Sequence, residues 1–360
     1  MAKVLVTGAT GFIGSHVARL LVERGHDVTL GVQNGSPDAA IVDLDCRRLQ
    51  LELGDRRTVR RALQGAERVF HCAGLTSVRP EDTERLFEVN VSGTKLVMEE
   101  CLRAEVERVI YTSSAAVVGP APHGQTADED QLFTAGRLGV PYVDSVHEGE
   151  LEALRVAARG LALVCVNPGV CFGPGDHLLS STRLVRSFLL GRVPVHVDGA
   201  ASIVDVRDVA SAHLLAAERG EIGQRYIVSA RNFTYDRLFA DLGRLSGVEP
   251  PVKLPAVAAR AVAEAIGASG RSWPLSQADV RAAGQWWTYR STKARRVLGW
   301  TSRPHEETLE ATVDWHLERE HQRIARTRGS QAMTRRLAGI AVGAGETAAG
   351  LLRRLPVPRP

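Results

Sequence analysis

The chain has 360 residues, of which 45 are Lys or Arg and 41 are Asp or Glu, and its formal net charge is +4. A single hydrophobic core rarely grows beyond about 250–300 residues, so this length predicts two lobes or one lobe with an annex. So small a charge argues against nucleic acid as a partner, and we expect none. The five cysteines form no C-x-x-C pair, so we expect free thiols in a reducing cytoplasm, without a disulfide framework or a metal site.

Strand-like and helix-like segments alternate through the first 168 residues. Apolar, β-branched runs predict strands at "KVLVTG", "HDVTLGV", "LQLELGD", "RVFHCAG", "RVIYTSS" and "LALVCVNPG". Helical spacing of apolar residues predicts helices at 12–25, about 56–64, 81–103 and 142–158. This alternation predicts an α/β fold, a Rossmann-type doubly wound parallel sheet.

The stretch "TGATGFIG" carries three glycines between the first strand and the first helix. Glycine permits a tight turn and lets the backbone approach a pyrophosphate, and the start of the helix offers free N–H groups to the phosphates. We therefore predict a dinucleotide site here. Its predicted cofactor-binding residues are Gly8, Thr10, Gly11, Phe12, Ile13 and Gly14.

The end of the second strand bears on which dinucleotide binds. An acidic residue there would bind the ribose hydroxyls of NAD, and a basic residue would bind the extra phosphate of NADP. The chain instead has uncharged Gln33, a predicted cofactor contact, and Asn34. We expect NADP or NAD, with NADP favoured by the missing acid. Asp55, after the third strand, is a candidate for the adenine amino group, or else the N-cap of the helix that follows.

Beyond Pro168 the regular alternation ends. We assign residues 1–170 to a dinucleotide-binding domain, whose sheet residues 200–230 are expected to complete, and 171–325 mainly to a smaller C-terminal substrate-binding lobe. Residues 326–360 form a tail, helical or disordered, whose apolar stretch is too short and polar to span a bilayer of about 30 Å. A docking segment is favoured there over an interfacial helix that makes peripheral membrane contact.

Several motifs in order carry a family resemblance. With the glycine turn come "HCAG", "NVSGT", "YTSSAAVVG", "YVDS" followed by a glutamate, "NPGVCFGPGD", "VDVRDVA" and "LGW". On these motifs the chain resembles the extended short-chain dehydrogenase/reductase (NAD-dependent epimerase/dehydratase) family. Within it, the chain is most similar to the branch of hopanoid-associated sugar epimerases and dihydroflavonol-4-reductase-like proteins.

The resemblance runs from residue 3 to about residue 318 and implies two lobes, a homodimer and hydride transfer at a carbinol or ketone. In that family the dimer forms through two long helices, which the sequence predicts at 81–103 and 142–158. By resemblance, Ser114 would hydrogen-bond the substrate oxygen and Tyr142 would be the general acid or base. Ala73 and Pro168 would line the nicotinamide end of the site, largely through their backbone.

The family pattern has a lysine four residues after the tyrosine, and Val146 stands there in this chain. Ser145 and Glu150 match the flanking residues of the pattern, so the register is kept. A cation one helical turn from Tyr142 would favour the phenolate. Lowering the pKa of a phenol by ~3 units requires ~4 kcal/mol, and a valine supplies no charge for it.

Other side chains are candidates to replace this cation. Arg137, Arg183 and Arg186 could reach the site from a loop or from the second lobe. His147 should point about 140° away from the tyrosine on an α-helix. His71, at a strand end, is expected to be a neutral, packed histidine.

Three functions follow from these residues. The first is an NAD(P)-dependent oxidoreductase with an atypical active site, acting on a carbonyl or secondary alcohol of a small lipophilic or secondary-metabolite substrate. The second is a non-redox enzyme that dehydrates, cyclises or isomerises a substrate in the same pocket. The third is an inactive cofactor-binding protein. Three tryptophans, Trp273, Trp286 and Trp287, either line a pocket for a bulky ligand or pack in the second lobe.

Overall fold

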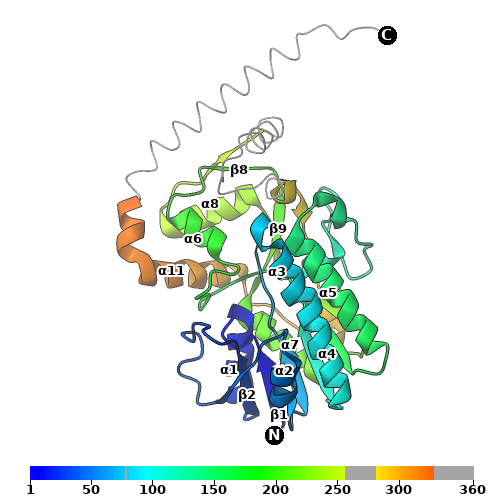
Figure 1. Cartoon of the computed structure of the whole chain (residues 1–360). Helices are drawn as coiled ribbons and strands as arrows, with labels where there is room; N and C mark the ends of the chain where they lie inside the picture. The colour runs from blue at the N-terminus through cyan, green and yellow to red at the C-terminus, as the bar shows by residue number, and fades with distance from the viewer. Residues whose placement is uncertain (78, 256–280, 328–360) are drawn as a thin grey trace, which may run out of the picture.

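A computed structural model describes residues 1–77, 79–255 and 281–327. A parallel sheet flanked by helices holds the N-terminus, and a second lobe with α6 and α8 lies beyond the carboxyl ends of its strands (Figure 1). The tail predicted from residue 326 falls outside the described residues after Thr327, as does Trp273. Within the described ranges, no helix has both the length and the apolar character needed to cross a membrane.

Seven parallel strands form the main sheet, in the order β10-β6-β5-β4-β1-β2-β3. They are β1 (Lys3–Thr7), β2 (Asp27–Val32), β3 (Arg47–Gln50), β4 (Arg68–His71), β5 (Arg108–Thr112), β6 (Leu163–Pro168) and β10 (Arg225–Val228). The central strands are apolar because helices cover both faces of the sheet. Strand order reverses between β1 and β4, and the crevice outside the carboxyl ends at such a point is where α/β sheets bind ligands.

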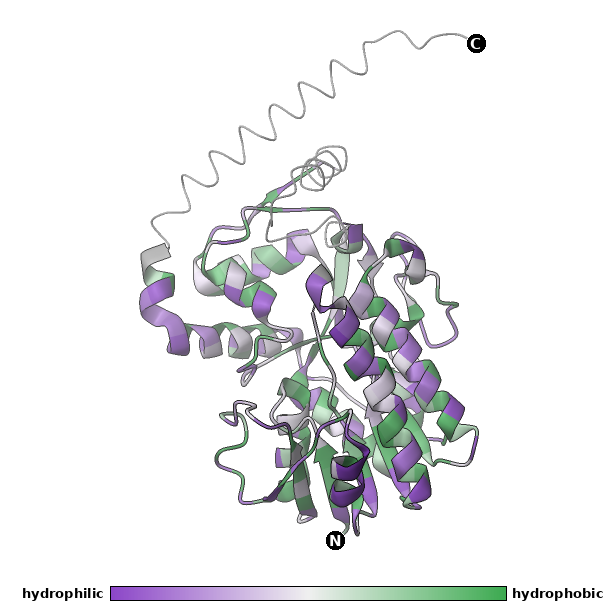
Figure 2. Cartoon of the chain, viewed as in Figure 1, coloured by the Kyte–Doolittle hydropathy of each residue, from purple (hydrophilic) through white to green (hydrophobic). Residues whose placement is uncertain are grey.

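The helices form a layer on each face of the sheet. Helices α1 (Phe12–Glu23) and α7 (Val206–Arg219) share one buried core with the sheet. Helices α2 (Arg56–Leu63), α4 (Thr94–Arg103) and α5 (Pro141–Ala157) pack on the opposite face. The strands of the main sheet are largely apolar, and the visible surfaces of α4 and α5 carry both polar and apolar residues (Figure 2). The predicted dimer through these helices stays a prediction.

Two elements differ from the prediction. The third strand was expected at "LQLELGD" but is β3, which begins at Arg47 and ends at Gln50. It is the edge strand of the sheet, so exposed arginines are tolerated there and the apolar signal is displaced. The helix predicted at 81–103 is divided into a 3₁₀ turn η1 (Pro80–Asp82), α3 (Thr83–Phe87), a π-helical turn η2 (Glu88–Gly93) and α4.

The side chain of Asn90 links the π-helical turn to two other segments of the chain. Asn90 in η2 turns its side chain to the backbone of Leu75, accepting from its N–H at 2.8 Å and donating to its carbonyl at 3.0 Å. It also donates to the Ser145 hydroxyl at 3.0 Å. One extra residue in this turn therefore ties α5 to the loop after β4, which sequence spacing does not reveal.

The second lobe is built on a smaller sheet. Its strands are β7 (Val170–Phe172), β9 (Ala200–Asp205), β11 (Arg231–Thr234) and β13 (Trp286–Trp287), with β8 (Val195–His196) and β12 (Val252–Lys253) forming a separate pair. Helices α6 (Arg183–Leu189), α8 (Tyr235–Ser246) and α11 (His305–Thr327) complete it. The remaining short turns are η3 (Ala115–Val118), η4 (Ala135–Leu138) and η5 (Ala294–Leu298). Trp300, after η5, returns to the core of the main sheet and donates to the Asp208 carbonyl at 2.9 Å.

Candidate active site

The glycine turn after β1 is shaped by close backbone contacts. Gly8 has a φ of +66°, and a Cβ there would lie 2.6 Å from the Ala73 backbone, so β1 and the loop after β4 meet without room for a side chain. A Cβ on Gly14 would collide with the Gly8 carbonyl. A Cβ on Gly11 would meet only Gly8 O, at 3.2 Å, so the space beyond Gly11 is open. Two glycines thus serve packing, and the third lets a ligand approach the backbone.

The start of α1 offers backbone donors. Gly11 is its N-cap, and neither a side-chain cap nor an acidic residue covers the first turn. Phe12 buries its ring in the core, so it can serve a ligand only through its N–H; Ile13 is partly buried. Free N–H groups and the helix dipole suit a pyrophosphate, and the residues present fit a dinucleotide.

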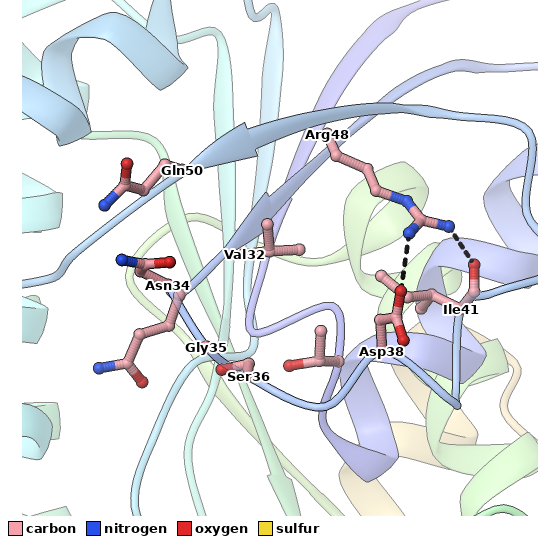
Figure 3. A pocket seen from close by; sticks show the side chains of 10 residues that line it. Val32, Asn34, Gly35, Ser36, Asp38, Ile41, Arg48 and Gln50 are labelled. Carbon is pink, nitrogen blue, oxygen red and sulfur yellow. Dashed lines mark hydrogen bonds and ion pairs between the residues drawn. The ribbon is translucent and has the colours of Figure 1, made fainter.

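A pocket of about 260 Å³ adjoins this turn at the end of β2. It is lined by Thr10, Val32, Gln33, Asn34, Gly35, Ser36, Asp38, Ile41, Arg48 and Gln50. Thr10 and Gln33, both predicted cofactor contacts, lie in it. Figure 3 shows Arg48 reaching from β3 toward the loop after β2. It donates to Asp38 at 3.1 Å and to the Ile41 carbonyl at 2.9 Å.

Arg48 is a charged residue that sequence reasoning missed. The sequence pattern assigns the cofactor-selecting charge to the end of β2, whereas Arg48 lies on the neighbouring strand, where Leu30 is its β2 partner. The parallel register of β2 and β3 was the one signal that could have found it. Asp55, by contrast, caps α2 by accepting from Arg57 N–H at 2.9 Å and does not line the pocket. Its contact with adenine stays a prediction.

Ser114 and Tyr142 meet beyond the carboxyl end of β5, which β4 separates from β1 in the sheet. Ser114 follows β5 as the N-cap of η3, and its Oγ accepts from Ala116 N–H at 3.2 Å. Tyr142 lies in the first turn of α5, whose N1 position is Pro141. Burial raises the pKa of Tyr142, while a hydrogen bond with the Ser114 hydroxyl acts in the opposite direction. Tyr142 is therefore a neutral phenol at neutral pH.

Buried polar contacts hold α5 in this position. The Ser145 hydroxyl, fully buried, donates to the Tyr142 carbonyl at 2.8 Å and accepts from Asn90. Glu150, 1% exposed, accepts from Asn167 at 2.5 Å and pairs with Arg225 at 2.9 Å. These two residues, which mark the register in the sequence, thus anchor the helix against η2, β6 and β10.

Val146 faces an apolar cluster. It is 8% exposed and packs with Ala115, Val117, Val118, Ala121, Ala127, Ile227 and Tyr289, against which Tyr142 and Trp287 also lie. The position where the family pattern has a cation is therefore dry and uncharged in this chain. Burial without a compensating charge keeps a phenol protonated.

The candidate replacement cations lie elsewhere. Arg186 forms an ion pair with Glu320 of α11, and Arg137 and Arg183 are exposed. Among the described residues, no ammonium or guanidinium contributes to the pKa of Tyr142. His147 stacks on Phe133 with ring centroids 3.7 Å apart.

His71, Ala73 and Pro168 lie at or just after the ends of strands β4 and β6. Burial lowers the pKa of His71 to about 4, so this histidine is neutral. Its Nδ1 lies 2.7 Å from the Thr7 hydroxyl, which accepts from Ala73 N–H at 3.3 Å. Pro168 is the buried last residue of β6. Within the described ranges, no cluster of three or more His, Cys, Asp or Glu could hold a metal ion.

A glycine turn at the point where strand order reverses, together with a serine after β5 and a tyrosine in the first turn of α5, defines a class of dinucleotide-dependent enzymes. Residues 4–229 match the model of the NAD dependent epimerase/dehydratase family, and the chain belongs to this family. Its members include NAD(P)-dependent epimerases, dehydratases and reductases.

Two relatives are similar to this chain over more than two thirds of its length. The chain is 38% identical over 248 residues to sterol demethylase protein B of Methylococcus capsulatus, covering 69% of this chain and 75% of that protein. It is 32% identical over 320 residues to a putative dihydroflavonol 4-reductase of Synechocystis, covering 86% and 93%.

Solved structures agree with the fold. A nucleoside-diphosphate-sugar epimerase from Pseudomonas aeruginosa has a TM-score of 0.74 and 26% identity, over 88% of this chain and 98% of that one. A Thermus thermophilus UDP-glucose 4-epimerase in complex with NAD has a TM-score of 0.71 and 24% identity, over 87% and 98%. The second likeness shows the fold alone.

Proposed function

We propose that this protein is an NAD(P)-dependent oxidoreductase that interconverts a carbonyl group and a secondary alcohol in a small lipophilic substrate. The observation that carries the proposal is the pairing of the Ser114 hydroxyl with the Tyr142 phenol beyond the end of β5, two strands away from the glycine turn that follows β1. Two hydroxyls that converge beside a dinucleotide site can bind and protonate one substrate oxygen.

The chemistry divides between the cofactor and two side chains. When bound, the reduced nicotinamide supplies a hydride to the carbonyl carbon. Ser114 donates a hydrogen bond to the carbonyl oxygen, and Tyr142 transfers its phenolic proton to that oxygen as the alcohol forms. Tyr142 then regains a proton from solvent, so the enzyme ends the cycle unchanged.

Without a lysine beside Tyr142, carbonyl reduction and alcohol oxidation should depend differently on pH. Carbonyl reduction needs a protonated Tyr142, which is the form that burial favours. Alcohol oxidation needs the phenolate, which forms only at alkaline pH without a cation nearby. We therefore expect reduction to predominate near neutral pH and oxidation to rise with pH.

Arg48 supports NADP as the preferred cofactor. Its guanidinium has five N–H groups, of which two are used by Asp38 and Ile41, so donors remain for a phosphate on the ribose. Asp38 holds the arginine at the pocket but also repels a phosphate. The pair therefore supports a preference for NADP without excluding NAD.

The surroundings of Tyr142 support a lipophilic substrate. The cluster around Val146 consists of small aliphatic side chains and rings. Two of the most similar relatives are named for a sterol and a dihydroflavonol, both ring-containing compounds. Apolar walls with a few hydroxyls suit such ligands better than a charged nucleotide sugar.

A non-redox reaction is the second candidate, and the neutral state of Tyr142 favours it. A phenol that stays protonated is a hydrogen-bond donor to a developing oxyanion, which dehydration or isomerisation requires. In that reaction a dinucleotide would not be consumed.

A binding and turnover experiment tests the proposal. NADPH and NADH are titrated by fluorescence, and the nicotinamide absorbance is then followed with a polycyclic ketone and a flavonoid ketone. We expect NADPH to bind more tightly and a lipophilic ketone to oxidise it. Failure to bind either dinucleotide contradicts the proposal, whereas binding without turnover of any carbonyl favours the second candidate.

The cofactor preference has its own variants. We expect Arg48→Gln to weaken NADPH binding about tenfold, the cost of one charge-assisted hydrogen bond, and to leave NADH unchanged. Arg47→Gln is the control, because Arg47 is the exposed neighbour on β3 and does not line the pocket. Asp38→Asn should tighten NADPH binding. Equal losses for NADPH and NADH in Arg48→Gln would contradict a phosphate contact.

A further inference from the structure

Tyr289 is a buried tyrosine that follows β13 and is 5% exposed. Its backbone is fixed on both sides by Asn232. The Tyr289 N–H donates to the Asn232 side-chain oxygen at 3.1 Å, and its carbonyl accepts from the Asn232 amide at 2.9 Å. The ring therefore occupies a defined position, set by β11 and β13 rather than by its neighbours in sequence.

The hydroxyl of Tyr289 lacks a hydrogen-bond partner among the described residues. Native proteins pair nearly all buried polar atoms, because an unpaired one costs free energy that a phenylalanine would not. Tyr289 should therefore contribute less to the free energy of unfolding than a phenylalanine would at this position. A tyrosine hydroxyl kept at such a cost suggests a function for it.

The surroundings of this hydroxyl point to the reaction pocket. Tyr289 packs in the same cluster as Val146, with Tyr142 against it. Burial raises the pKa of Tyr289, and its electrostatic interaction with Tyr142 raises it further. The two phenols therefore border one apolar cluster, at the place where the family pattern has its cation, and no hydrogen bond joins them while Tyr142 keeps its proton.

We propose that Tyr289 is a positioning residue that acts through Tyr142, donating a hydrogen bond to the Tyr142 oxygen as that oxygen releases its proton. Tyr289 keeps its own proton throughout; only the bond between Tyr142 oxygen and hydrogen breaks, and the proton goes to the substrate oxygen. A neutral donor would thus supply part of the stabilisation that a lysine would give a phenolate. This inference rests on the proposed oxidoreductase function.

Other groups around Tyr142 do not offer the same contact. The Tyr111 phenol from β5 also interacts with Tyr142, but it has a hydrogen bond with Thr94. The Cys171 thiol from β7 is buried with a raised pKa, and it makes ionisation of Tyr142 harder. Ser114 is engaged at η3 and is assigned to the substrate. Tyr289 is the phenol of this group whose hydroxyl has no partner among the described residues.

Tyr289→Phe removes one oxygen and tests the proposal. We expect kcat/KM for ketone reduction to fall about tenfold to a hundredfold, the value of a hydrogen bond to a charged group. The pH at which reduction declines should move upward, because Tyr142 becomes a weaker acid. Thermal stability should be unchanged or higher. Unchanged kinetics and an unchanged pH profile in a folded variant would overturn the proposal.

A double-variant cycle separates a role at Tyr142 from packing. In a Val146→Lys background, the ammonium takes over stabilisation of the phenolate, so Tyr289→Phe should cost less than in the native chain. Equal cost in both backgrounds would overturn the proposal. Tyr235→Phe is the matched control: burial raises the pKa of Tyr235 to about 12, but its ring packs on Phe239 in the second lobe.

A measurement without turnover keeps the inference separate from the proposed function. The chain has only five tyrosines, so ring-labelled tyrosine gives a simple NMR spectrum. The alkaline titration of Tyr142 should begin at higher pH in Tyr289→Phe and should not move in Tyr235→Phe. If no carbonyl is reduced but this shift occurs, the oxidoreductase proposal fails and the contact stands. If reduction occurs without the shift, the Tyr289 proposal fails alone. Should Tyr289→Phe not fold, Tyr142→Phe must shift the Tyr289 signal, and no shift overturns the contact.

Discussion

The glycine turn and the start of α5 both lie at the carboxyl ends of the parallel strands, yet they depart from their family pattern to different degrees. The turn keeps all three glycines, and at Gly8 and Gly14 the surrounding backbone leaves no room for a side chain. At α5, Tyr142, Ser145 and Glu150 keep the pattern while Val146 does not. Backbone packing constrains the first region, whereas a single side-chain charge distinguishes the second. The cofactor half can therefore be intact while the chemistry changes.

The largest effect is expected at the turn. Gly14→Ala should abolish detectable dinucleotide binding, because its Cβ collides with the Gly8 carbonyl. The same clash should lower the free energy of unfolding by about 1–3 kcal/mol, as overpacking does. Gly54→Ala is the control, since Gly54 has no heavy atom within 4 Å of its Cβ position. Normal NADPH binding by Gly14→Ala in a fluorescence titration would contradict the assigned cradle.

The next effect concerns the hydroxyl pair. Ser114→Ala should reduce kcat/KM about a hundredfold, the effect of removing one donor from a reacting oxygen, and should leave dinucleotide affinity unchanged. Ser113→Ala serves as the matched control because Ser113 is adjacent in sequence and is not assigned a contact with the substrate. Steady-state kinetics that are equal in the two variants would show that Ser114 does not contact the substrate.

Placing a lysine at position 146 should change the rate less than the loss of Ser114 does, and it should raise the rate of alcohol oxidation. Val146→Lys should lower the pKa of Tyr142 by about one unit or more and raise alcohol oxidation near neutral pH about tenfold. The variant should also be less stable than the native chain, because an ammonium replaces a methyl group in an apolar cluster. Val146→Met controls for size without charge. If oxidation does not increase in a folded Val146→Lys, Tyr142 is not the acid or base.

The last effect is on stability and not on activity, and it is the acid response beneath the glycine turn. The pKa of His71 is about 4 in the folded chain against 6.5 ordinarily, so the unfolded chain takes up the proton first as pH falls. His71 thus contributes stability above pH 6.5 that is lost toward pH 4, by at most about 1.4 kcal/mol per pH unit. Denaturant unfolding of His71→Gln should show a shallower pH dependence there. His321→Gln, exposed on α11, should match the native slope.

Local sequence patterns determined much of this protein. The apolar strands, the glycine turn and the register of α5 were readable because each depends on neighbours within one or two turns of chain. The valine at 146 was visible for the same reason. The three arginines considered as replacement cations were not resolved by sequence, since their positions depend on how the second lobe folds.

Tertiary structure decided what surrounds each site. Arg48 reaches the pocket because β3 pairs in parallel with β2, and its own segment carries no mark of ligand binding. Tyr289 joins the cluster of Val146 and Tyr142 because β13 pairs with β9, which brings a segment distant in sequence to that cluster. Sequence spacing cannot encode such contacts, since they arise from packing between elements that are far apart in the chain. The glycine motif predicts the cofactor site from sequence alone, whereas tertiary packing determines which charged groups and hydroxyls lie near it.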